Sequence, residues 1–329
     1  MSWWSESHVL VTGGAGFLGS NLCLALAARG AKVTALDCFL EGGGANPANL
    51  EGSSVNLVRG DLRDFDLSRL CEGVKAVFNL AAQTSHLGGQ LDPMVDLQIN
   101  GVAQLRLIAA LREAAPSAIV VHASTRQFYG RVSGLPVDEG NPIAPPDANG
   151  VSKFAGEQYW MLEHRIKRRP VVSLRLTNCY GPRLRICDEK QGFIGVWLRC
   201  VLEGKPFEIW DGRQLRDMTY VDDVTEAFLA AAENEACHGR AFNIGGTAPI
   251  SLGDLAALLK RVAGDKVDYV LRPFPADRSL IDIGSYYADD AEFRNASGWA
   301  PKIDSEEGLR LSLEWFRPRL AAYLRQAGI

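Results

Sequence analysis

The 329-residue chain lacks an excess of basic residues, paired cysteines and any long hydrophobic run. Lys and Arg number 35 against 39 Asp and Glu, so nucleic acid is not expected as the main partner. The seven cysteines include no CxxC pair, which disfavours a disulfide framework or a zinc site and suits a reducing cytoplasm. No apolar run reaches the ~18 residues of a membrane span, and the N-terminus lacks the basic segment of a signal peptide. We therefore expect a cytoplasmic protein without a membrane partner or metal site.

Short apolar runs alternate with helical patterns through the first half of the chain. The predicted strands cover 8–13, 32–37, 55–61, 76–82, 118–124 and 171–178, and the predicted helices include 17–30, 94–115 and 150–168. Strands separated by helices predict an α/β fold, a Rossmann-type doubly wound parallel sheet. After residue 180 the segments are shorter and richer in turns. We expect residues 1–180 to form the Rossmann domain, with 218–246 returning to it, and residues 181–329 to form mainly a smaller C-terminal substrate lobe.

Three glycines lie where the first predicted strand meets the first predicted helix, in the segment VTGGAGFLG. Gly13 permits a sharp turn, Gly16 lets the backbone approach a pyrophosphate, and Gly19 lets the helix pack on the strand. Phe17 and Leu18 open the helix, whose N–H groups and positive dipole end favour phosphate. The pattern predicts a dinucleotide site.

Asp37 ends the second predicted strand, where a ribose-binding carboxylate belongs in such a site. A carboxylate accepts hydrogen bonds from both ribose hydroxyls and repels a 2′-phosphate, so NAD is favoured over NADP. The alternative is a tight turn beside a solvated aspartate.

Seven motifs follow one another in the order and spacing of a known family. They are TGGAGFLG, GDLRD (60–64), NLAAQ (79–83), STRQFYG (124–130), NGVSKFAGE (149–157), RLTNCYGPR (175–183) and LRDMTYVDDV (215–224). From about residue 8 to about residue 300, the chain resembles the extended short-chain dehydrogenase/reductases, in particular the nucleotide-sugar epimerases and dehydratases of the UDP-glucose 4-epimerase type.

The resemblance implies further cofactor contacts and an oligomeric state. It places Asp61 and Leu62 at the adenine, Leu80, Ala81 and Ala82 along the dinucleotide, Asn100 as a support of the catalytic region, and Lys153 on the nicotinamide ribose. It also implies a homodimer, formed through the helices at 94–115 and 150–168.

The catalytic tyrosine of that family is absent. The tyrosine precedes the lysine by four residues, so that both side chains share one helical face, and here that position is Asn149, four before Lys153. A carboxamide is no base near neutral pH. None of the eight tyrosines has a lysine four residues further on, so a shift in register does not restore the pair.

The resemblance places Thr125 at the family's catalytic hydroxyl, with Ser124 beside it, although both also suit a polar strand end. Three replacements for the base remain open. His86, on a loop expected to border the substrate, titrates in the right range but suits polar surface equally well. Lys153 serves if burial lowers its pKa. The third option links Thr125 through water to Asp147 or another group.

By the same resemblance Arg216 and Arg278 hold a nucleotide diphosphate, and Asn178 contacts the sugar nucleotide. A guanidinium fork suits phosphate oxygens, whereas the alternative is ion pairing at the surface with Asp217 or Asp282. We predict an NAD-dependent nucleotide-sugar epimerase that acts through a transient 4-keto sugar. The alternatives are a dehydratase or decarboxylase of the same family, or a non-catalytic protein that binds NAD or a sugar nucleotide.

Overall fold

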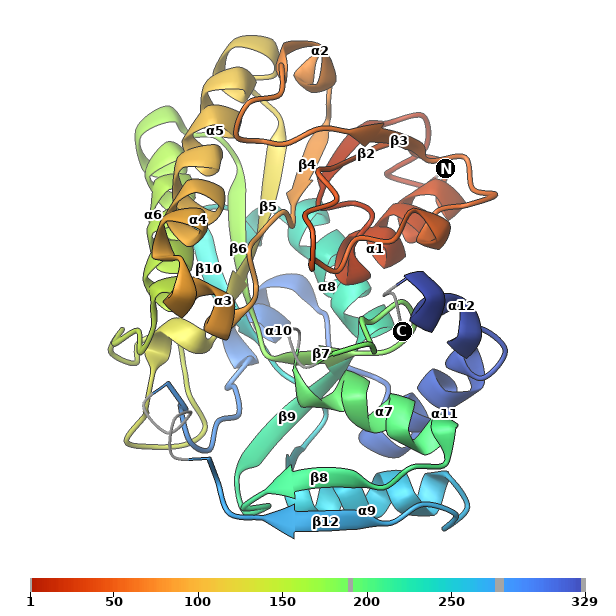
Figure 1. The fold of residues 1–329 in the computed structure, drawn as a ribbon. Coiled ribbons are helices and arrows are strands. Elements are labelled where there is room, and N and C mark those ends of the chain that lie inside the picture. The colour runs from red at the N-terminus through yellow and green to blue at the C-terminus, as the bar shows by residue number, and fades with distance from the viewer. Residues whose placement is uncertain (1, 189–191, 276–280, 327–329) are drawn as a thin grey trace.

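The structure, a computed structural model, describes residues 2–188, 192–275 and 281–326, which form a larger and a smaller lobe (Figure 1). The larger lobe is built on a sheet of seven parallel strands in the order β10-β6-β5-β4-β1-β2-β3. These strands are β1 (His8–Thr12), β2 (Lys32–Asp37), β3 (Asn56–Arg59), β4 (Ala76–Asn79), β5 (Ile119–Thr125), β6 (Val171–Leu176) and β10 (Arg240–Ile244).

The central strands are apolar because helices cover both faces of the sheet. In β1 every residue after His8 is buried, and Val9 pairs with Val33 of β2 and with Ala76 of β4. Parallel strands buried on both faces read as continuous apolar runs, as these do. The strand order reverses between β1 and β4, which opens a crevice at the carboxyl ends of these two strands.

The covering helices form two layers. One face carries α1 (Phe17–Ala28), α8 (Val221–Glu233) and α10 (Ala291–Ser297), and the other carries α2 (Ser68–Cys71), α5 (Ala103–Ala114) and α6 (Ala148–Lys167). In Figure 1, α5 and α6 lie on the left of the sheet and α1 and α8 on the right. Two short helices, α3 (His86–Leu91) and α4 (Pro93–Leu97), follow β4, and a π-helical turn (Gln98–Val102) joins α4 to α5. None of the described helices is both long and apolar enough to cross a bilayer.

The smaller lobe lies beyond the carboxyl ends of β4 and β6, at the bottom of Figure 1. Its strands are β7 (Asn178–Tyr180), β8 (Phe207–Trp210), β9 (Leu215–Tyr220), β11 (Pro249–Ser251) and β12 (Tyr269–Arg272). Its helices are α7 (Phe193–Glu203), α9 (Leu252–Val262), α11 (Ser305–Phe316) and α12 (Leu320–Gln326). A separate apolar core holds them together, and the side chain of Phe17, from the start of α1, reaches into it.

The structure confirms the predicted doubly wound α/β fold. The helix predicted at 150–168 is α6, and the one predicted at 94–115 is the continuous run of α4, the π-helical turn and α5. The segment 218–246 divides differently from the expectation. Strand β10 joins the main sheet and α8 packs on it, but β9 pairs with β7 and β11 in a separate three-stranded sheet. The reason is that β9 lies beside β7 as its parallel partner, with Asn178 opposite Met218.

Candidate active site

The turn between β1 and α1 depends on glycines that leave room for close backbone contact. Gly13 has a φ of +67°, and a Cβ there would lie 2.9 Å from the backbone nitrogen of Ala81. A Cβ on Gly19 would lie 2.1 Å from the carbonyl oxygen of Gly13. A residue with a side chain therefore does not fit at either position unless the strand or the helix moves.

Helix α1 begins at this turn, and no side chain of the described residues caps its first N–H groups. Its N-cap is Gly16, which makes no side-chain capping bond, and no acidic residue lies in the first turn of the helix. The N–H groups of Phe17 and Leu18 and the positive end of the helix dipole are therefore available to an anion. These features fit the pyrophosphate of a dinucleotide.

Asp37 ends β2 beside the glycine turn, and backbone donors hold its carboxylate. Oδ2 accepts from the N–H of Ala15 at 3.1 Å, and Oδ1 accepts from the N–H of Phe39 at 3.0 Å. Burial raises the pKa of this carboxyl, and the N–H groups act in the opposite direction. In this fold the adenosine ribose lies at such a carboxylate, whose charge disfavours a 2′-phosphate.

The other residues predicted to line the cofactor follow β3 and β4. Asp61 pairs with Arg63 at 2.7 Å, and this hydrogen bond lowers the pKa of Asp61. Leu62 is buried in the core between the sheet and α5. Residues 80–82 run past the glycine turn directly after β4, and the backbone of Ala81 lies against the first glycine. All of these residues follow the carboxyl ends of β3 and β4, at the same edge of the sheet as the glycine turn, but their contacts with a ligand remain predictions.

Asn100 lies in the π-helical turn and connects the loop after β4 to α6. Its Oδ1 accepts the N–H of Gln83 at 3.0 Å, and its Nδ2 donates to Asp96 Oδ1 at 3.0 Å and to Ser152 Oγ at 3.2 Å. A Cβ on Gly156 of α6 would lie 2.3 Å from the carbonyl oxygen of Asn100, so α6 passes very close to this turn. Asn100 therefore fixes the loop that leads to His86.

Asn149 and Lys153 lie one turn apart on α6, and their side chains contact different neighbours. Asn149 Nδ2 donates to the carbonyl oxygen of Gln83 at 2.7 Å and to Asp96 Oδ1 at 2.8 Å. Lys153 Nζ donates to the carbonyl oxygen of Ala123 at 2.6 Å, and burial lowers its pKa to about 8. Both side chains are buried, and the amide group of Asn149 makes its hydrogen bonds within the protein interior.

Asp96, the carboxylate that faces Asn149, was not singled out from the sequence. It is fully buried on α4, its Oδ2 has no hydrogen-bond partner within the described part of the chain, and burial raises its pKa. An aspartate on a short helix looks like a solvated residue in sequence. Only its packing against α6 reveals a buried carboxyl group under that helix.

Ser124 and Thr125 end β5, next to the carbonyl group that holds Lys153. Ser124 is buried, and its Oγ makes no hydrogen bond among the described residues. Thr125 Oγ1 accepts the N–H of Gln127 at 3.1 Å, which leaves its O–H free to donate. The end of the strand therefore carries two hydroxyl residues directly after Ala123, whose carbonyl oxygen holds the lysine.

The two tyrosines that pack beside this segment do not replace the missing phenol. The hydroxyl of Tyr129 donates to Asn243 at 2.9 Å and accepts from Arg175 at 2.6 Å, while burial raises its pKa to about 12. Tyr286 stacks on Tyr129 and is fully buried, which raises its pKa further. A tyrosinate is therefore not available at either position near neutral pH.

His86 begins α3 and lies against the N-terminus of α6. Its Nδ1 is 2.8 Å from Oδ2 of Asp147, the N-cap of α6. Asp147 Oδ1 accepts the N–H of Gly150 at 2.7 Å, and Oδ2 also accepts from Gln127 Nε2 at 3.1 Å. The side chain of His86 is 40% exposed and that of Asp147 is completely buried. Among the candidate bases, this imidazole has a carboxylate partner.

Two of the three predicted substrate contacts lie at the junction of the lobes. Arg216 is buried on β9, its Nη1 donates to the carbonyl oxygens of Leu215 at 2.8 Å and Gly284 at 2.5 Å, and burial lowers its pKa to about 9. Asn178 begins β7 and donates to the carbonyl oxygen of Asp217 at 3.4 Å. Arg278 lies outside the described residues.

Arg126 lies at the same junction and was not predicted as a site residue. Its Nη2 donates to Asn178 Oδ1 at 3.0 Å, and its guanidinium lies 5.0 Å from the ring centroid of Tyr286. Its Nη1 is buried and has no hydrogen-bond partner among the described residues. The available signal was an arginine directly after the Ser–Thr pair.

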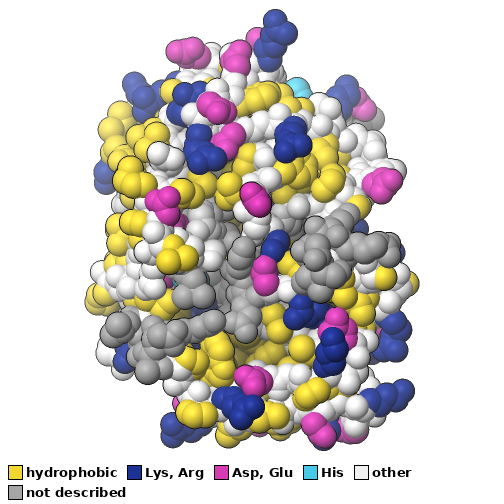
Figure 2. Space-filling view, in the orientation of Figure 1, with side chains coloured by type: hydrophobic (Ala, Val, Ile, Leu, Met, Phe, Trp, Pro, Cys, Tyr) yellow, Lys and Arg dark blue, Asp and Glu magenta, His cyan; other side chains and the backbone are white. Residues whose placement is uncertain are grey.

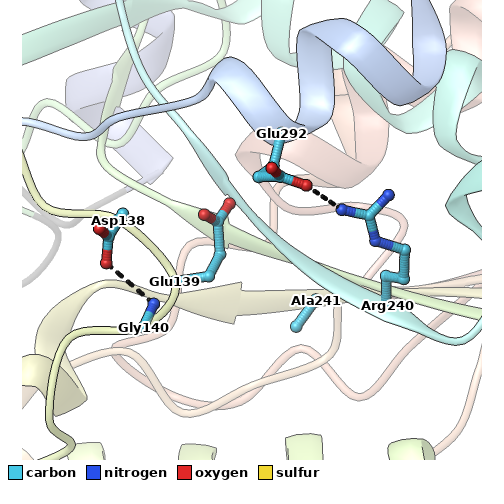
Figure 3. Close-up of a pocket in the computed structure, with 6 residues that line it drawn as sticks. All are labelled: Asp138, Glu139, Gly140, Arg240, Ala241 and Glu292. Atoms are coloured by element: carbon cyan, nitrogen blue, oxygen red, sulfur yellow. Dashed lines mark hydrogen bonds and ion pairs between the residues drawn. The ribbon is translucent and has the colours of Figure 1, made fainter.

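A hollow of about 500 Å³ lies away from these groups, at the free edge of the main sheet (Figure 3). Its lining residues are Asp138, Glu139, Gly140, Arg240, Ala241 and Glu292. Its one arginine, Arg240, is paired with Glu292, and the other charged residues of the lining are acidic, so the hollow disfavours a phosphate. None of the predicted site residues lines it, and we place the candidate site at the crevice.

The reversed strand order, the glycine turn and the carboxylate of Asp37 define a dinucleotide-binding protein of the Rossmann type. The chain belongs to the NAD dependent epimerase/dehydratase family, which it matches over residues 9–245. It is therefore an enzyme of an NAD-dependent family.

Similar proteins support this assignment over nearly the whole chain. A UDP-glucose 4-epimerase from Mycolicibacterium smegmatis is 31% identical over 94% of this chain and 98% of its own. The structure of a Thermotoga maritima UDP-glucose 4-epimerase with UDP-glucose superimposes with a TM-score of 0.85, at 30% identity over 95% of this chain and 99% of that one. A Thermus thermophilus UDP-glucose 4-epimerase in complex with NAD has a TM-score of 0.82, at 30% identity over 95% and 99%.

Proposed function

We propose that this chain is an NAD-dependent nucleotide-sugar epimerase that acts through a transient 4-keto sugar, with a proton acceptor other than tyrosine. One observation carries the proposal. A buried lysine, Lys153, is held at the end of β5 on the residue before two hydroxyl residues, Ser124 and Thr125, at the same sheet edge as a glycine turn shaped for a dinucleotide. The similar proteins named UDP-glucose 4-epimerase support the substrate class.

The residues at the end of β5 and on α6 have separate tasks in this reaction. When bound, NAD supplies a reversible acceptor for a hydride from the sugar carbon. A hydroxyl of Ser124 or Thr125 donates a hydrogen bond to the reacting sugar oxygen and orients it. Lys153, held on the carbonyl oxygen of Ala123, binds the nicotinamide ribose, and with a pKa of about 8 it is mostly protonated at neutral pH. Epimerisation requires that the keto sugar turn before the hydride returns.

The substrate diphosphate binds at the junction of the lobes. Arg216 and Arg278 are the proposed phosphate ligands, and Asn178 contacts the sugar nucleotide. The buried Nη1 of Arg126, two residues from Ser124, supplies a further donor to the sugar. Because guanidinium groups bind phosphate oxygens in a planar, paired geometry, they suit this substrate better than lysine.

The enzyme works in the cytoplasm as a homodimer formed by α4, α5 and α6. Hydrophobic side chains gather along the left margin of Figure 2, where these helices lie. The exposed apolar residues of this dimer face, which includes the π-helical turn between α4 and α5, are Met94, Leu97, Val102, Leu105, Val151, Tyr159, Leu162 and Ile166. A second copy of the same face would cover these side chains, and an apolar patch of this kind is typical of an interface. The cytoplasmic location is consistent with seven free cysteines.

The test is turnover by purified protein with a panel of nucleotide sugars, namely UDP-glucose, UDP-glucuronic acid, UDP-N-acetylglucosamine and the corresponding CDP and dTDP sugars. We expect a new epimer in the proton NMR spectrum with one member of the panel, and transient absorbance at 340 nm. Tight binding without turnover across the panel would show instead a non-catalytic binding protein. The interior hydrogen bonds of Asn149 favour this second reading, because they give the residue a purely structural task.

A dehydratase is the weaker alternative on this geometry. Expulsion of a hydroxyl needs an additional acid–base pair close to the keto sugar. The residues that follow Thr125 are Arg126 and Gln127, neither of which is such an acid. The carboxylates near the site, Asp96 and Asp147, already accept hydrogen bonds from side chains of the protein.

A further inference from the structure

His86 and Asp147 form a polar pair that the proposed function has not yet used. One ring nitrogen of His86 contacts a carboxylate whose side chain has no exposed surface, while the ring itself is 40% exposed. The Nε2 atom has no hydrogen bond within the described part of the chain. The imidazole is therefore anchored at one nitrogen, and the other is free to exchange a proton.

Asp147 is held as an anion by the start of α6. Its burial acts to raise its pKa, but the hydrogen bond and charge of His86 and the N–H of Gly150 outweigh burial, so its pKa is lowered. The positive end of the α6 dipole acts in the same direction. An ionised carboxylate at Nδ1 selects the tautomer with its proton on Nδ1 and leaves a lone pair on Nε2.

The pair lies beside the position of the absent phenol. Asp147, the N-cap of α6, lies two residues before Asn149. The amide of Asn149 donates to the carbonyl oxygen of Gln83, and His86 lies three residues after Gln83. The carboxamide of Asn149 points into the interior, toward Asp96. Asp96 on α4 lies within the electrostatic reach of both His86 and Asp147, and Asp92, the N-cap of α4, is a further carboxylate that acts on Asp96.

The other candidate bases are less suitable. Lys153 is buried with its Nζ on a carbonyl oxygen, so its ammonium is already a donor within the protein. Thr125 acting through water to Asp147 is disfavoured because the Asp147 side chain has no exposed surface and both of its oxygens already accept hydrogen bonds from the protein. His86 alone combines partial exposure with a carboxylate partner.

We propose that Nε2 of His86 is the proton acceptor in sugar oxidation, with Asp147 as its positioning residue; this rests on the proposed function. The O–H bond of the sugar hydroxyl breaks and its proton binds Nε2. The C–H bond on the same carbon breaks with its electron pair, as a hydride accepted by the oxidised cofactor, and the C=O bond forms. The imidazolium, stabilised by Asp147, returns the proton to the sugar oxygen when the hydride comes back, so the enzyme ends unchanged.

The experiment compares the wild type with His86→Ala, His86→Asn, Asp147→Asn and the remote control His238→Gln. His86→Asn keeps an amide donor for Asp147 but is not a base, and Asp147→Asn keeps a good N-cap for α6 without its charge. We expect single-turnover hydride transfer to fall ~10²–10⁴-fold in both His86 variants. NAD affinity measured by calorimetry should stay within about two-fold in all variants, and His238→Gln should behave as the wild type.

Two further readouts separate a base from a structural residue. External imidazole should restore part of the rate to His86→Ala but none to a variant that is merely misfolded. In ¹⁵N NMR spectra of histidine-labelled protein, the His86 ring should be protonated on Nδ1 in the neutral wild type, and Asp147→Asn should abolish this preference. The pH profile of hydride transfer tests the lysine alternative. A limb near 8 would assign the base to Lys153 and overturn the inference.

The outcomes distinguish the two proposals. Retained hydride transfer in His86→Ala, with a wild type that turns over, overturns the assignment of His86 and leaves the epimerase function standing. A wild type that binds NAD and nucleotide sugars but transfers no hydride overturns both.

Discussion

Replacing Asn149 by tyrosine would restore the residue that the family resemblance leads one to expect, and we predict a loss of stability without a gain in rate. Asn149 is 3% exposed, and its amide donates to the buried carboxylate of Asp96 at 2.8 Å and to a carbonyl oxygen at 2.7 Å. A phenol at this position cannot donate to both acceptors. A hydrogen bond to a charged group contributes about 1.5–3 kcal/mol, and a ring forced into the interior costs a further ~1–3 kcal/mol.

The assay is chemical denaturation at pH 7. It compares the wild type with Asn149→Tyr, with Asn149→Ala and with a control variant that loses a surface hydrogen bond. Asn149→Ala should lose ~1.5–3 kcal/mol of unfolding free energy, and Asn149→Tyr at least as much. The control is Asn141→Ala, which removes an exposed amide that donates to Asp138 at 3.0 Å. Its unfolding free energy should fall by no more than ~0.5 kcal/mol.

The pH dependence gives this prediction a second check. Burial raises the pKa of Asp96, and the hydrogen bond from Asn149 opposes that rise. Because the folded pKa lies above the unfolded one, the ionised carboxyl destabilises the protein at neutral pH, and this cost disappears as the pH falls through the folded pKa. The loss in Asn149→Ala should therefore shrink on acidification. A tyrosine variant with full stability and a ten-fold higher rate would refute this reasoning, and would mark the site as a decayed form of the tyrosine site.

Three further substitutions test other parts of the structure. Lys153→Met should abolish hydride transfer yet raise the unfolding free energy at pH 7 by up to ~3 kcal/mol, since burial lowers the lysine pKa from 10.5 to about 8. Because the folded pKa is the lower one, this gain should fade between pH 8 and 10.5; a constant gain in urea titrations across that range would exclude the ammonium as its cause. Asp37→Ser should weaken NAD binding and relax discrimination against NADP in calorimetry, whereas unchanged selectivity would remove Asp37 from the ribose site. Ile166→Glu, at an exposed position on α6, should halve the mass measured by light scattering, with the exposed Val270→Glu on β12 as the control; a dimer that survives Ile166→Glu would place the interface elsewhere.

Sequence reasoning found those parts of the site that are local. The glycine turn is encoded by a strand, three glycines and the start of a helix between residues 8 and 19, and the structure has that turn between β1 and α1. The spacing of Asn149 and Lys153 placed both on α6, where they lie. The fold class followed from the alternation of apolar runs and helical patterns, because each strand and helix is recognisable from its own residues.

The contacts that decide the chemistry join distant segments. His86 meets Asp147 across 61 residues, and Asn149 meets Asp96 across 53. Neither pairing could be identified from the sequence around these residues, since an aspartate before a helix signals only a cap. The same holds for β9, whose place in the small sheet depends on its pairing with β7 and not on its own residues.

The sequence by itself determined a parallel α/β sheet with a phosphate-binding turn, a lysine one helical turn after an asparagine, and the absence of a phenol there. These features could be predicted because each depends on the pattern of residues within one strand, one turn or one helix. Only the tertiary structure decided that Asn149 faces a buried carboxylate and that a histidine is anchored beside it. Such pairs form where loops return to the sheet edge, and their path depends on the packing of the whole chain.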